Sequence, residues 1–224
     1  MIIARGITLI VALFVITGCA STPNFQKAEE LVHLGTIHAE SGEYESAIDR
    51  YNAALQVAPS YAKAHNSKGN IWFMEGKYDL AIDEYRKAIE VEPSYAKAYN
   101  NLGFAFFEQE KYVRAINEFT HAITYNPKYA KAYNNRGLVY FAQGEYDRAI
   151  LDYNMAIKID PDLAKPYDNR GAIYMITGDV DNACSDFIRA CELGECSTFD
   201  WMKISGYCSF NFIASIDHEK RTSS

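Results

Sequence analysis

Four cysteines lie close together near the C-terminal end of the 224-residue chain, at Cys184, Cys191, Cys196 and Cys208. An even number of cysteines in an exported chain indicates disulfide bonds, and four cysteines allow three full pairings. Cys184 and Cys191 are seven residues apart on one expected helix. Their Cα atoms are then about 10 Å apart, beyond the roughly 7 Å limit of a disulfide. Two pairings remain open: 184–196 with 191–208, and 184–208 with 191–196.

Other chemistry at these and other reactive residues is less favoured. Cys184 and Cys191 stand where Ile150 and Ile157 stand 34 residues earlier, so free thiols in a core are the alternative to disulfides. A zinc site is disfavoured because no C-x₂-C pair occurs. The histidines form no HExxH motif, and neither a nucleophile elbow nor a Gly-rich phosphate loop is present. We therefore expect no enzymatic activity, no metal and no cofactor.

The fifth cysteine, Cys19, ends the first apolar stretch of the chain. Arg5 precedes the run ITLIVALFVI, which is shorter than the roughly 20 residues of a membrane-spanning helix and is typical of a secretory signal. The ending Ile16-Thr17-Gly18-Cys19 resembles the bacterial lipobox. This resemblance implies a lipoprotein signal peptide over residues 1–18 and lipidation of Cys19. The alternative is an ordinary signal peptide that contains a cysteine.

A lipid on Cys19 would determine where the protein resides. Buried acyl chains contribute about 0.8 kcal/mol per CH₂, so two or three chains hold a protein on a membrane nearly permanently. Ala20 follows the cysteine, and in the lipoprotein family alanine there implies the outer membrane in some bacteria. We expect a bacterial cell-envelope protein, anchored in the outer membrane and facing the periplasm.

The rest of the chain is organised by a repeat of 34 residues. Glycines recur at this spacing, and prolines close four of the units: Gly35, Gly69, Gly103, Gly137 and Gly171, with Pro59, Pro93, Pro127 and Pro161. Alanines recur in phase with them. A period that holds without an insertion predicts a solenoid, in which one supersecondary unit is copied in line.

Each unit contains two helical patterns joined by a short turn. Within residues 96–129, apolar residues at helical spacing form two stripes: Tyr99, Leu102, Gly103 and Phe106, then Tyr112, Ala115, Phe119 and Ala122. Small residues at a helix crossing let two backbones approach closely, and aromatic side chains fill the space beside them. We interpret the repeated Tyr51, Tyr85 and Tyr153 as packing residues.

This periodic set resembles the tetratricopeptide repeat (TPR) family, whose pattern of aromatics, Leu-Gly, alanines and proline has the same period. The resemblance implies an all-α, right-handed superhelical solenoid of five helix-turn-helix repeats: 28–61, 62–95, 96–129, 130–163 and 164–197. Trp201 and Ile204 fall in the slots of Tyr167 and Arg170. Residues 198–208 are therefore expected to form a capping helix over the fifth repeat. We expect residues 19–27 to be a tether and residues 209–224 a tail.

In a TPR array the first helices line the concave face, and the resemblance implies that ligands bind there. Lysines, asparagines and phenylalanines recur in columns on these helices, and we expect them to form a peptide-binding groove: Lys63, Asn66, Asn70, Phe73, Lys97, Asn100, Asn101, Phe107, Lys131, Asn134, Asn135, Phe141, Lys165 and Asn169. The asparagine column resembles the ladder of the O-linked N-acetylglucosamine transferase superhelix. Asparagine amides can pair with the N–H and C=O groups of an extended backbone. The alternative is surface sequence inherited by duplication.

Charge is distributed unevenly over the two helices of a unit. Acidic residues, including Glu84 and Asp152, gather on the second helices and turns, where we expect an acidic outer surface. The net charge of −7 argues against non-specific binding of nucleic acid, which depends on cationic side chains.

Together these features predict a membrane-anchored scaffold for proteins or peptides of the periplasm. We expect a role in cell-envelope assembly or peptidoglycan remodelling. The alternatives are a pilus-assembly lipoprotein and a cysteine-rich repeat protein that binds or hydrolyses cell-wall precursors.

Overall fold

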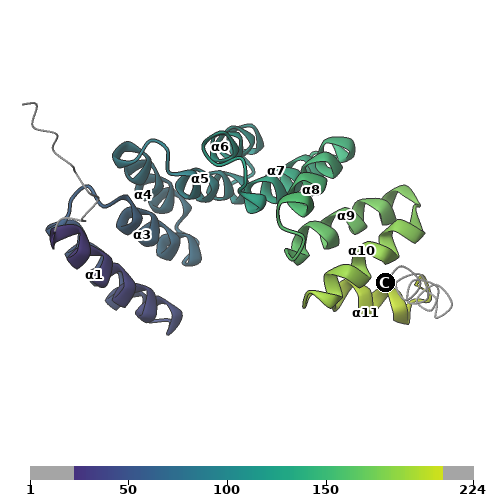
Figure 1. Cartoon of the computed structure of the whole chain (residues 1–224), viewed down its shortest axis with the longest axis horizontal. Coiled ribbons are helices and arrows are strands. Elements are labelled where there is room, and N and C mark those ends of the chain that lie inside the picture. Colours follow the sequence, from purple (N-terminus) through teal and green to yellow (C-terminus); the bar gives the residue numbers. More distant parts are fainter. Residues whose placement is uncertain (1–22, 209–224) are drawn as a thin grey trace, which may run out of the picture.

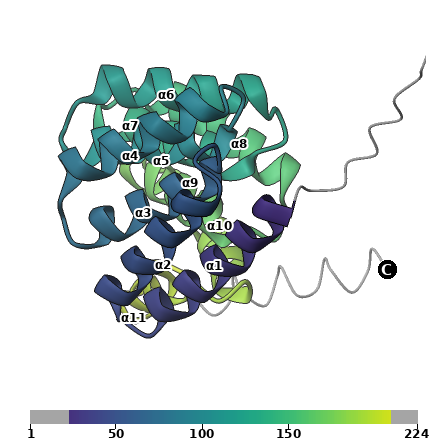
Figure 2. The ribbon, with the colours of Figure 1, turned by 90° about the vertical axis from the view of Figure 1, so that its left-hand side faces the viewer.

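A computed structural model describes residues 23–208, which fold into eleven α-helices and no strand (Figure 1). The helices are α1 Pro23–Glu40, α2 Tyr44–Val57, α3 Ala62–Met74, α4 Tyr78–Val91, α5 Ala96–Glu108, α6 Tyr112–Tyr125, α7 Ala130–Ala142, α8 Tyr146–Ile159, α9 Ala164–Thr177, α10 Val180–Glu192 and α11 Ser197–Ile204. Figure 1 shows them following one another in an arch with α1 and α11 at its two ends. In the view turned by 90°, the two end helices α1 and α11 both lie below α6 (Figure 2). The predicted all-α solenoid is confirmed.

The first helix of the described residues begins earlier than the sequence pattern indicates. Residues 19–27 are expected to be a tether, but α1 already begins at Pro23. Proline suits a first helical position because its missing N–H has no partner there. Phe25 then packs edge-to-face on Tyr61, with ring centroids 5.8 Å apart. The predicted signal peptide (residues 1–18), Cys19 and the tail (residues 209–224) lie outside the described residues.

Close crossings join the two helices of each repeat. A Cβ atom added at Gly69 would lie 2.6 Å from the Tyr85 ring, and one at Gly103 would lie 3.0 Å from the Phe119 ring. The repeated glycine therefore leaves room for the aromatic ring of the second helix. Alanines on that helix are fully buried, as at Ala81, Ala88 and Ala115. Tyr51, Tyr85 and Tyr153 are buried too, which confirms their packing role.

The turns between paired helices have a left-handed backbone. Gly42, Gly76, Gly144 and Gly178 have φ angles between 73° and 85°, which glycine readily allows. In the third repeat Glu110 takes this place with a φ of 57°. One turn geometry thus serves all five repeats, although one of them lacks the glycine.

Buried ion pairs link the two helices of three repeats, and they correct one prediction. Glu84 and Asp152 are not on an acidic outer surface, since their exposed fractions are 6% and 5%. Arg136 donates two hydrogen bonds of 2.8 Å to Asp152, and Arg170 donates two to Asp186, of 2.8 and 2.6 Å. The prediction is wrong for these two acids and holds for others such as Asp83, which is exposed. A column of charges on the second helix cannot by itself show that the first helix supplies a cation.

Glu84 has the most cationic surroundings of these acids. Its carboxylate accepts from His65 Nδ1 at 2.7 Å and Lys87 Nζ at 2.9 Å, and Lys68 Nζ lies 3.3 Å away. Burial by itself raises the pKa of Glu84, but the hydrogen bonds from His65 and Lys87 and the charge of Lys68 outweigh it and lower the pKa to about 2. The side chain is therefore ionised wherever the protein is handled near neutral pH.

Two disulfides tie the C-terminal end of the solenoid together. They join Cys184 to Cys208 and Cys191 to Cys196, which is one of the two pairings left open by the sequence. The capping helix α11 is shorter than the expected 198–208, and Gly206 follows it with a φ of 79°. It covers the fifth repeat through Met202, which is 1% exposed.

The outer side of α11 is apolar and open. Repeat counting assigns Trp201 and Ile204 to slots of a sixth first helix, but their side chains are 58% and 87% exposed. α11 packs on α10, and within residues 23–208 no second helix follows α11 to cover its outer side. The slots of the repeat therefore stop predicting burial at this end.

Candidate functional site

The first helices of the three central repeats present lysine, asparagine and apolar residues along one face. On α5, Lys97, Asn101 and Phe104 follow at intervals of four and three residues, which places them on one side of the helix. The same slots on α7 hold Lys131, Asn135 and Leu138. Because α5 and α7 are successive first helices of the arch (Figure 1), these residues form a lysine, an asparagine and an apolar band across the two helices. The same slots on α3 hold Lys63, Ser67 and Asn70.

The asparagines form a continuous chain of side-chain hydrogen bonds from repeat to repeat. Each bond runs from the Nδ2 of one first helix to the Oδ1 of the preceding one at 3.0 Å, in the pairs Asn101–Asn66, Asn135–Asn100 and Asn169–Asn134. Within a helix, Asn100 donates to Asn101 and Asn134 donates to Asn135, both at 3.3 Å. Asn101 Nδ2 also donates to Asn70 Oδ1, and we call these six asparagines together with Asn70 the asparagine ladder. It joins four first helices.

The structure separates the predicted groove asparagines into two groups. Asn66, Asn100 and Asn134 are 2%, 7% and 8% exposed, because they lie between successive repeats. Their Oδ1 atoms each accept a bond from the next repeat. Asn101, Asn135 and Asn169 are only partly buried. The second group is therefore the one whose amides border the open groove.

The predicted lysine column is paired at its ends and unpaired in its middle. Lys63 lies 3.9 Å from Glu29 of α1, and Lys165 lies 3.0 Å from Glu195. Lys97 and Lys131 have no acidic partner within residues 23–208. The positive charge available to a ligand is thus concentrated on the third and fourth repeats.

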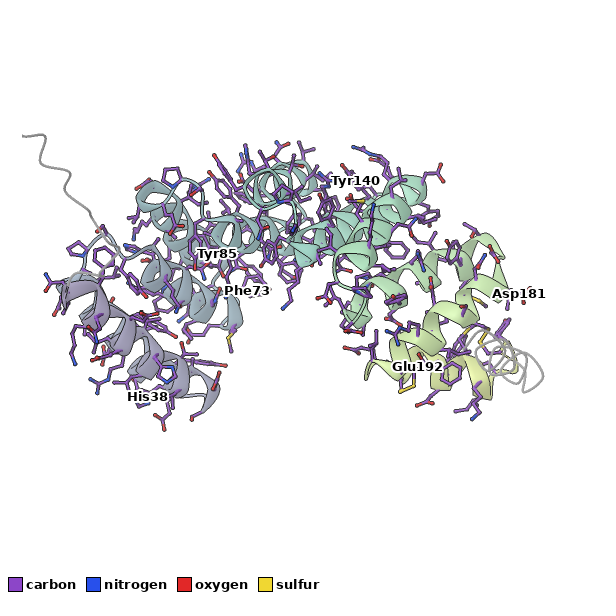
Figure 3. The ribbon with its side chains drawn as sticks, in the orientation of Figure 1. His38, Phe73, Tyr85, Tyr140, Asp181 and Glu192 are labelled. Atoms are coloured by element: carbon purple, nitrogen blue, oxygen red, sulfur yellow. A yellow bond between two sulfur atoms is a disulfide. The ribbon has the colours of Figure 1, made fainter. Side chains whose placement is uncertain are left out.

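The predicted phenylalanines extend this face with a run of aromatic rings. Each predicted phenylalanine packs on the tyrosine that begins the second helix of its repeat. The ring centroids are 5.3 to 5.9 Å apart in the pairs Phe73–Tyr78, Phe107–Tyr112 and Phe141–Tyr146. Phe104 bridges two repeats, since it lies 5.5 Å from Phe73 and 5.9 Å from Phe107. Figure 3 shows Phe73 on the inner side of the arch. The apolar band is therefore continuous from the second repeat to the third.

A hollow of about 360 Å³ opens where the asparagine and apolar bands meet. It is bordered by the amides of Asn70, Asn100, Asn101 and Asn135, and by Phe73, Met74, Tyr85 and Phe104. The Tyr85 hydroxyl donates to Asn70 Oδ1 at 2.9 Å, and Asn70 Oδ1 also accepts from Asn101 Nδ2 at 3.0 Å. Apolar walls with a few fixed polar groups are typical of a binding site. We call this the central hollow.

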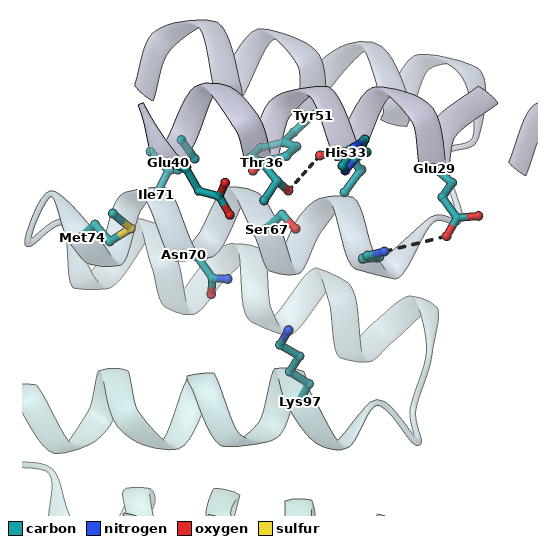
Figure 4. A pocket seen from close by; sticks show the side chains of 13 residues that line it. Glu29, His33, Thr36, Glu40, Tyr51, Ser67, Asn70, Ile71, Met74 and Lys97 are labelled. Atoms are coloured by element: carbon teal, nitrogen blue, oxygen red, sulfur yellow. Dashed lines mark hydrogen bonds and ion pairs between the residues drawn. The ribbon is translucent and has the colours of Figure 1, made fainter. Parts of the chain in front are cut away.

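A second hollow of about 550 Å³ lies between α1 and α3 (Figure 4). The side chains of Glu29, His33 and Glu40 project from α1, while Ser67 and Lys97 face them from α3 and α5. Glu29 is held by its ion pair with Lys63, shown as a dashed line. This end of the groove therefore has an acidic wall opposite a basic one.

Sequence reasoning missed several residues of these two hollows. Glu29 and His33 occupy the columns of Lys63 and Ser67 one repeat earlier, so extending the columns to the first repeat would have found them. Met74 lines both hollows and is 57% exposed. The sequence pattern could not have indicated Met74, since the same slot holds Glu108 and Ala142 in the next repeats.

Family models match the chain over residues 35–193. Models described as TPR repeat match residues 35–74, 69–109 and 103–144, and tetratricopeptide repeat models match residues 130–163 and 164–193. The chain belongs to the tetratricopeptide repeat family. This confirms the resemblance drawn from the glycine, alanine and proline columns, and it explains the arch, because TPR units stack in line.

Solved TPR structures resemble this one over most of the chain. The crystal structure of MamA is 31% identical, with a TM-score of 0.61, over 72% of this chain and 95% of that one. PilF of Pseudomonas aeruginosa is 22% identical, with a TM-score of 0.72, over 77% of this chain and 79% of that one. PilW, a type IV pilus biogenesis factor, is 20% identical, with a TM-score of 0.68, over 76% and 79%. No curated protein sequence matches.

TPR arrays are in general protein-interaction modules without catalytic activity, and the concave face described above has the chemistry of such a module. Between residues 23 and 208, none of the helices combines the length and the apolar character that crossing a membrane requires.

Proposed function

We propose that this TPR protein is a lipid-anchored scaffold of the bacterial cell envelope that holds partner proteins by extended segments in its concave groove. The central hollow carries the proposal, because amides of the asparagine ladder border an apolar surface there. Its partners are periplasmic proteins or peptides, and its role is in envelope assembly or peptidoglycan remodelling. Nucleic acid is not among the ligands, since the chain has a net charge of −7.

The amide groups of the ladder that keep unused donor or acceptor capacity suit a peptide backbone. Asn135 Nδ2 donates one bond, to Asn100, and an amide nitrogen has two hydrogens to donate. Asn101 Oδ1 accepts one bond, from Asn100, and an amide oxygen can accept two. The ladder thus offers a backbone C=O one donor and a backbone N–H one acceptor, on neighbouring first helices.

Photo-crosslinking in cells tests the groove. A photoreactive amino acid replacing Phe104 should crosslink a partner protein, because this side chain lines the central hollow. The matched control replaces Asp83, an exposed residue of α4 that lines neither hollow. Crosslinks from Asp83 and none from Phe104 would place binding on the outer surface and refute the groove proposal.

The anchor and the compartment are supported by the sequence of the leader and by the cysteines. Disulfides persist in oxidising compartments such as the bacterial periplasm, which suits the bonds Cys184–Cys208 and Cys191–Cys196. Replacing the lipobox cysteine, Cys19→Ser, should shift the protein from the outer-membrane fraction to soluble or mislocalised material. If this variant still fractionates with the outer membrane, the lipid anchor is wrong. Four free thiols in protein recovered from the periplasm would contradict the two disulfides.

A pilus-assembly lipoprotein is the second candidate, favoured by the similarity to PilW, a type IV pilus biogenesis factor. Deletion of the gene distinguishes the two roles. Loss of surface pili with an intact cell wall supports the pilus role, whereas altered cell shape or peptidoglycan with normal pili supports envelope assembly.

A further inference from the structure

The middle of the groove has a charge opposite to that of the whole protein. The chain carries 29 acidic and 22 basic residues. The 39 residues of α3, α5 and α7 nevertheless include one acid, Glu108, at the very end of α5. Two of their cations, Lys68 and Arg136, are neutralised by buried acids of the second helices. Lys97 and Lys131 are not paired in this way, so they give the groove its charge.

Three lysines without acidic partners in the described chain gather around one hollow. Lys97, Lys128 and Lys131 line an open hollow of about 600 Å³ at the ends of α5 and α7. Asp160 also lines it and forms no ion pair with them at the distances of a salt bridge. The hollow is thus cationic in an acidic protein, and charge complementarity favours an acidic ligand there.

The apolar part of the central hollow lies on the same face of α5. Phe104 lines it together with Phe73 and Met74, and Met74 is 57% exposed. A large apolar side chain placed there would cover surface that is now open to water. Burying such a side chain is favourable in proportion to the apolar area removed from water. A ligand therefore gains from carrying one.

The distance between the two subsites fixes a spacing in the ligand. Lys97 and Phe104 are seven residues apart on α5, so their Cα atoms are separated by about 10 Å along the helix axis. An extended chain rises about 3.3 Å per residue, so this distance corresponds to roughly three residues. Asn101 lies between the two, where a bound backbone would pass.

We infer that the groove recognises an extended segment in which an aromatic or large aliphatic residue stands three positions from Asp or Glu. The apolar side chain packs on Phe73, Met74 and Phe104, and the carboxylate lies between Lys97 and Lys131. The ladder amides of Asn101 and Asn135 pair with the backbone between them. This inference rests on the proposed peptide-binding function and adds the chemistry of the ligand to it.

Four fluorescent octapeptides on the folded, disulfide-bonded protein test this spacing. The first carries Glu and Phe three positions apart in an otherwise Ser/Gly/Ala background. The others replace Glu by Lys, replace Phe by Ser, or make Glu and Phe adjacent. By fluorescence anisotropy at low salt, the first should bind about tenfold more tightly than each of the others. Equal binding of all four would overturn the inference.

Charge reversal in the protein locates the acidic subsite. Lys97→Glu with Lys131→Glu should weaken binding of the Glu peptide about tenfold and strengthen binding of the Lys peptide. The control, Arg50→Glu with Lys203→Glu, makes the same change at two exposed cations of α2 and α11 and should alter neither. Circular dichroism verifies that both proteins fold. An equal effect of the control would overturn the assignment.

The apolar subsite has a matched variant within the chain. Phe104→Asn introduces the residue that the second repeat has at the same slot, Asn70, and should remove the preference for Phe over Ser in the peptide. A preference that survives would overturn this part of the inference.

Binding to vesicles of phosphatidylglycerol with no peptide preference would show that the lysines face a lipid surface instead. If the Phe104 crosslink forms in cells but no peptide preference appears, the ligand chemistry fails and the scaffold function stands.

Discussion

The second and fourth repeats have equivalent helices and helix crossings, but they differ in the groove floor, by which we mean the slot of Asn70 and the tyrosine beneath it. In the second repeat the Tyr85 hydroxyl donates to Asn70 at 2.9 Å, and Asn70 also accepts from Asn101 of the third repeat. In the fourth, Leu138 holds the slot of Asn70, and the buried Tyr153 hydroxyl finds no hydrogen-bond partner among the described residues. One slot on the first helix therefore decides whether the floor is polar.

The difference shows how a repeat array separates stability from recognition. The glycine–aromatic crossing is common to both repeats and supports the fold. The slot one residue after that glycine points toward the groove and varies as Asn70, Phe104 and Leu138 along the central repeats. The central hollow forms where this slot supplies first an amide and then a phenyl ring.

The largest expected effect tests what the two repeats share. Gly69→Leu and Gly137→Leu should each lower the free energy of unfolding by about 3 kcal/mol, because even a Cβ atom would overlap the ring of Tyr85 or Tyr153. Chemical denaturation followed by circular dichroism measures both. A large loss in one repeat with none in the other would mean that the crossings are not equivalent.

The next largest effect on stability is expected at the buried acid Glu84, which lies in the second repeat. Glu84→Gln should cost about 2 kcal/mol at pH 7, because the carboxylate is held by His65, Lys68 and Lys87. The pKa of Glu84 is lowered from 4.5 to about 2 in the folded protein. Its contribution is therefore complete above about pH 5 and is lost as the pH falls through 4.5 toward 2.

Denaturation of wild type and Glu84→Gln at several pH values measures this dependence. The gap between the two proteins should narrow steadily below pH 4.5. A gap that stays constant down to pH 2 would show that the glutamine variant is destabilised by altered packing and not by the lost charge.

The smallest effect distinguishes the two floors most directly. Tyr85→Phe should cost about 1 kcal/mol, since it removes a buried hydrogen bond to Asn70. Tyr153→Phe should cost nothing or stabilise the protein by up to about 1 kcal/mol, because its buried hydroxyl has no partner in the described chain. Thermal unfolding of the two variants under one condition compares them.

Transplanting the polar slot sharpens this comparison. Leu138→Asn should give the Tyr153 hydroxyl the acceptor that Tyr85 has. In a double-mutant cycle of Leu138→Asn with Tyr153→Phe, we expect a favourable coupling of about 1 kcal/mol. A coupling of zero would show that the fourth repeat cannot reproduce the bond of the second.

The sequence by itself determined the repeat and its helices. Each helix forms from a local pattern of apolar residues, and the 34-residue period places equivalent residues in equivalent slots. The fold class, the packing role of Tyr85 and the presence of cysteine pairs near the C-terminal end could therefore be predicted from spacing. The rise per residue of a helix excluded one disulfide pairing, but it could not decide between the other two.

Only the tertiary structure decided how the slots face one another. Asn66 and Asn101 are 35 residues apart, and whether they meet depends on the rotation between successive repeats, which no single helix encodes. The same rotation buries Asn66, Asn100 and Asn134 while it leaves Asn101 and Asn135 at the groove. Glu84 is buried rather than exposed because the first helix places His65 and Lys68 opposite it. The repeat pattern determines on which side of its helix a residue lies. Which residue it contacts depends on how the helices pack against one another.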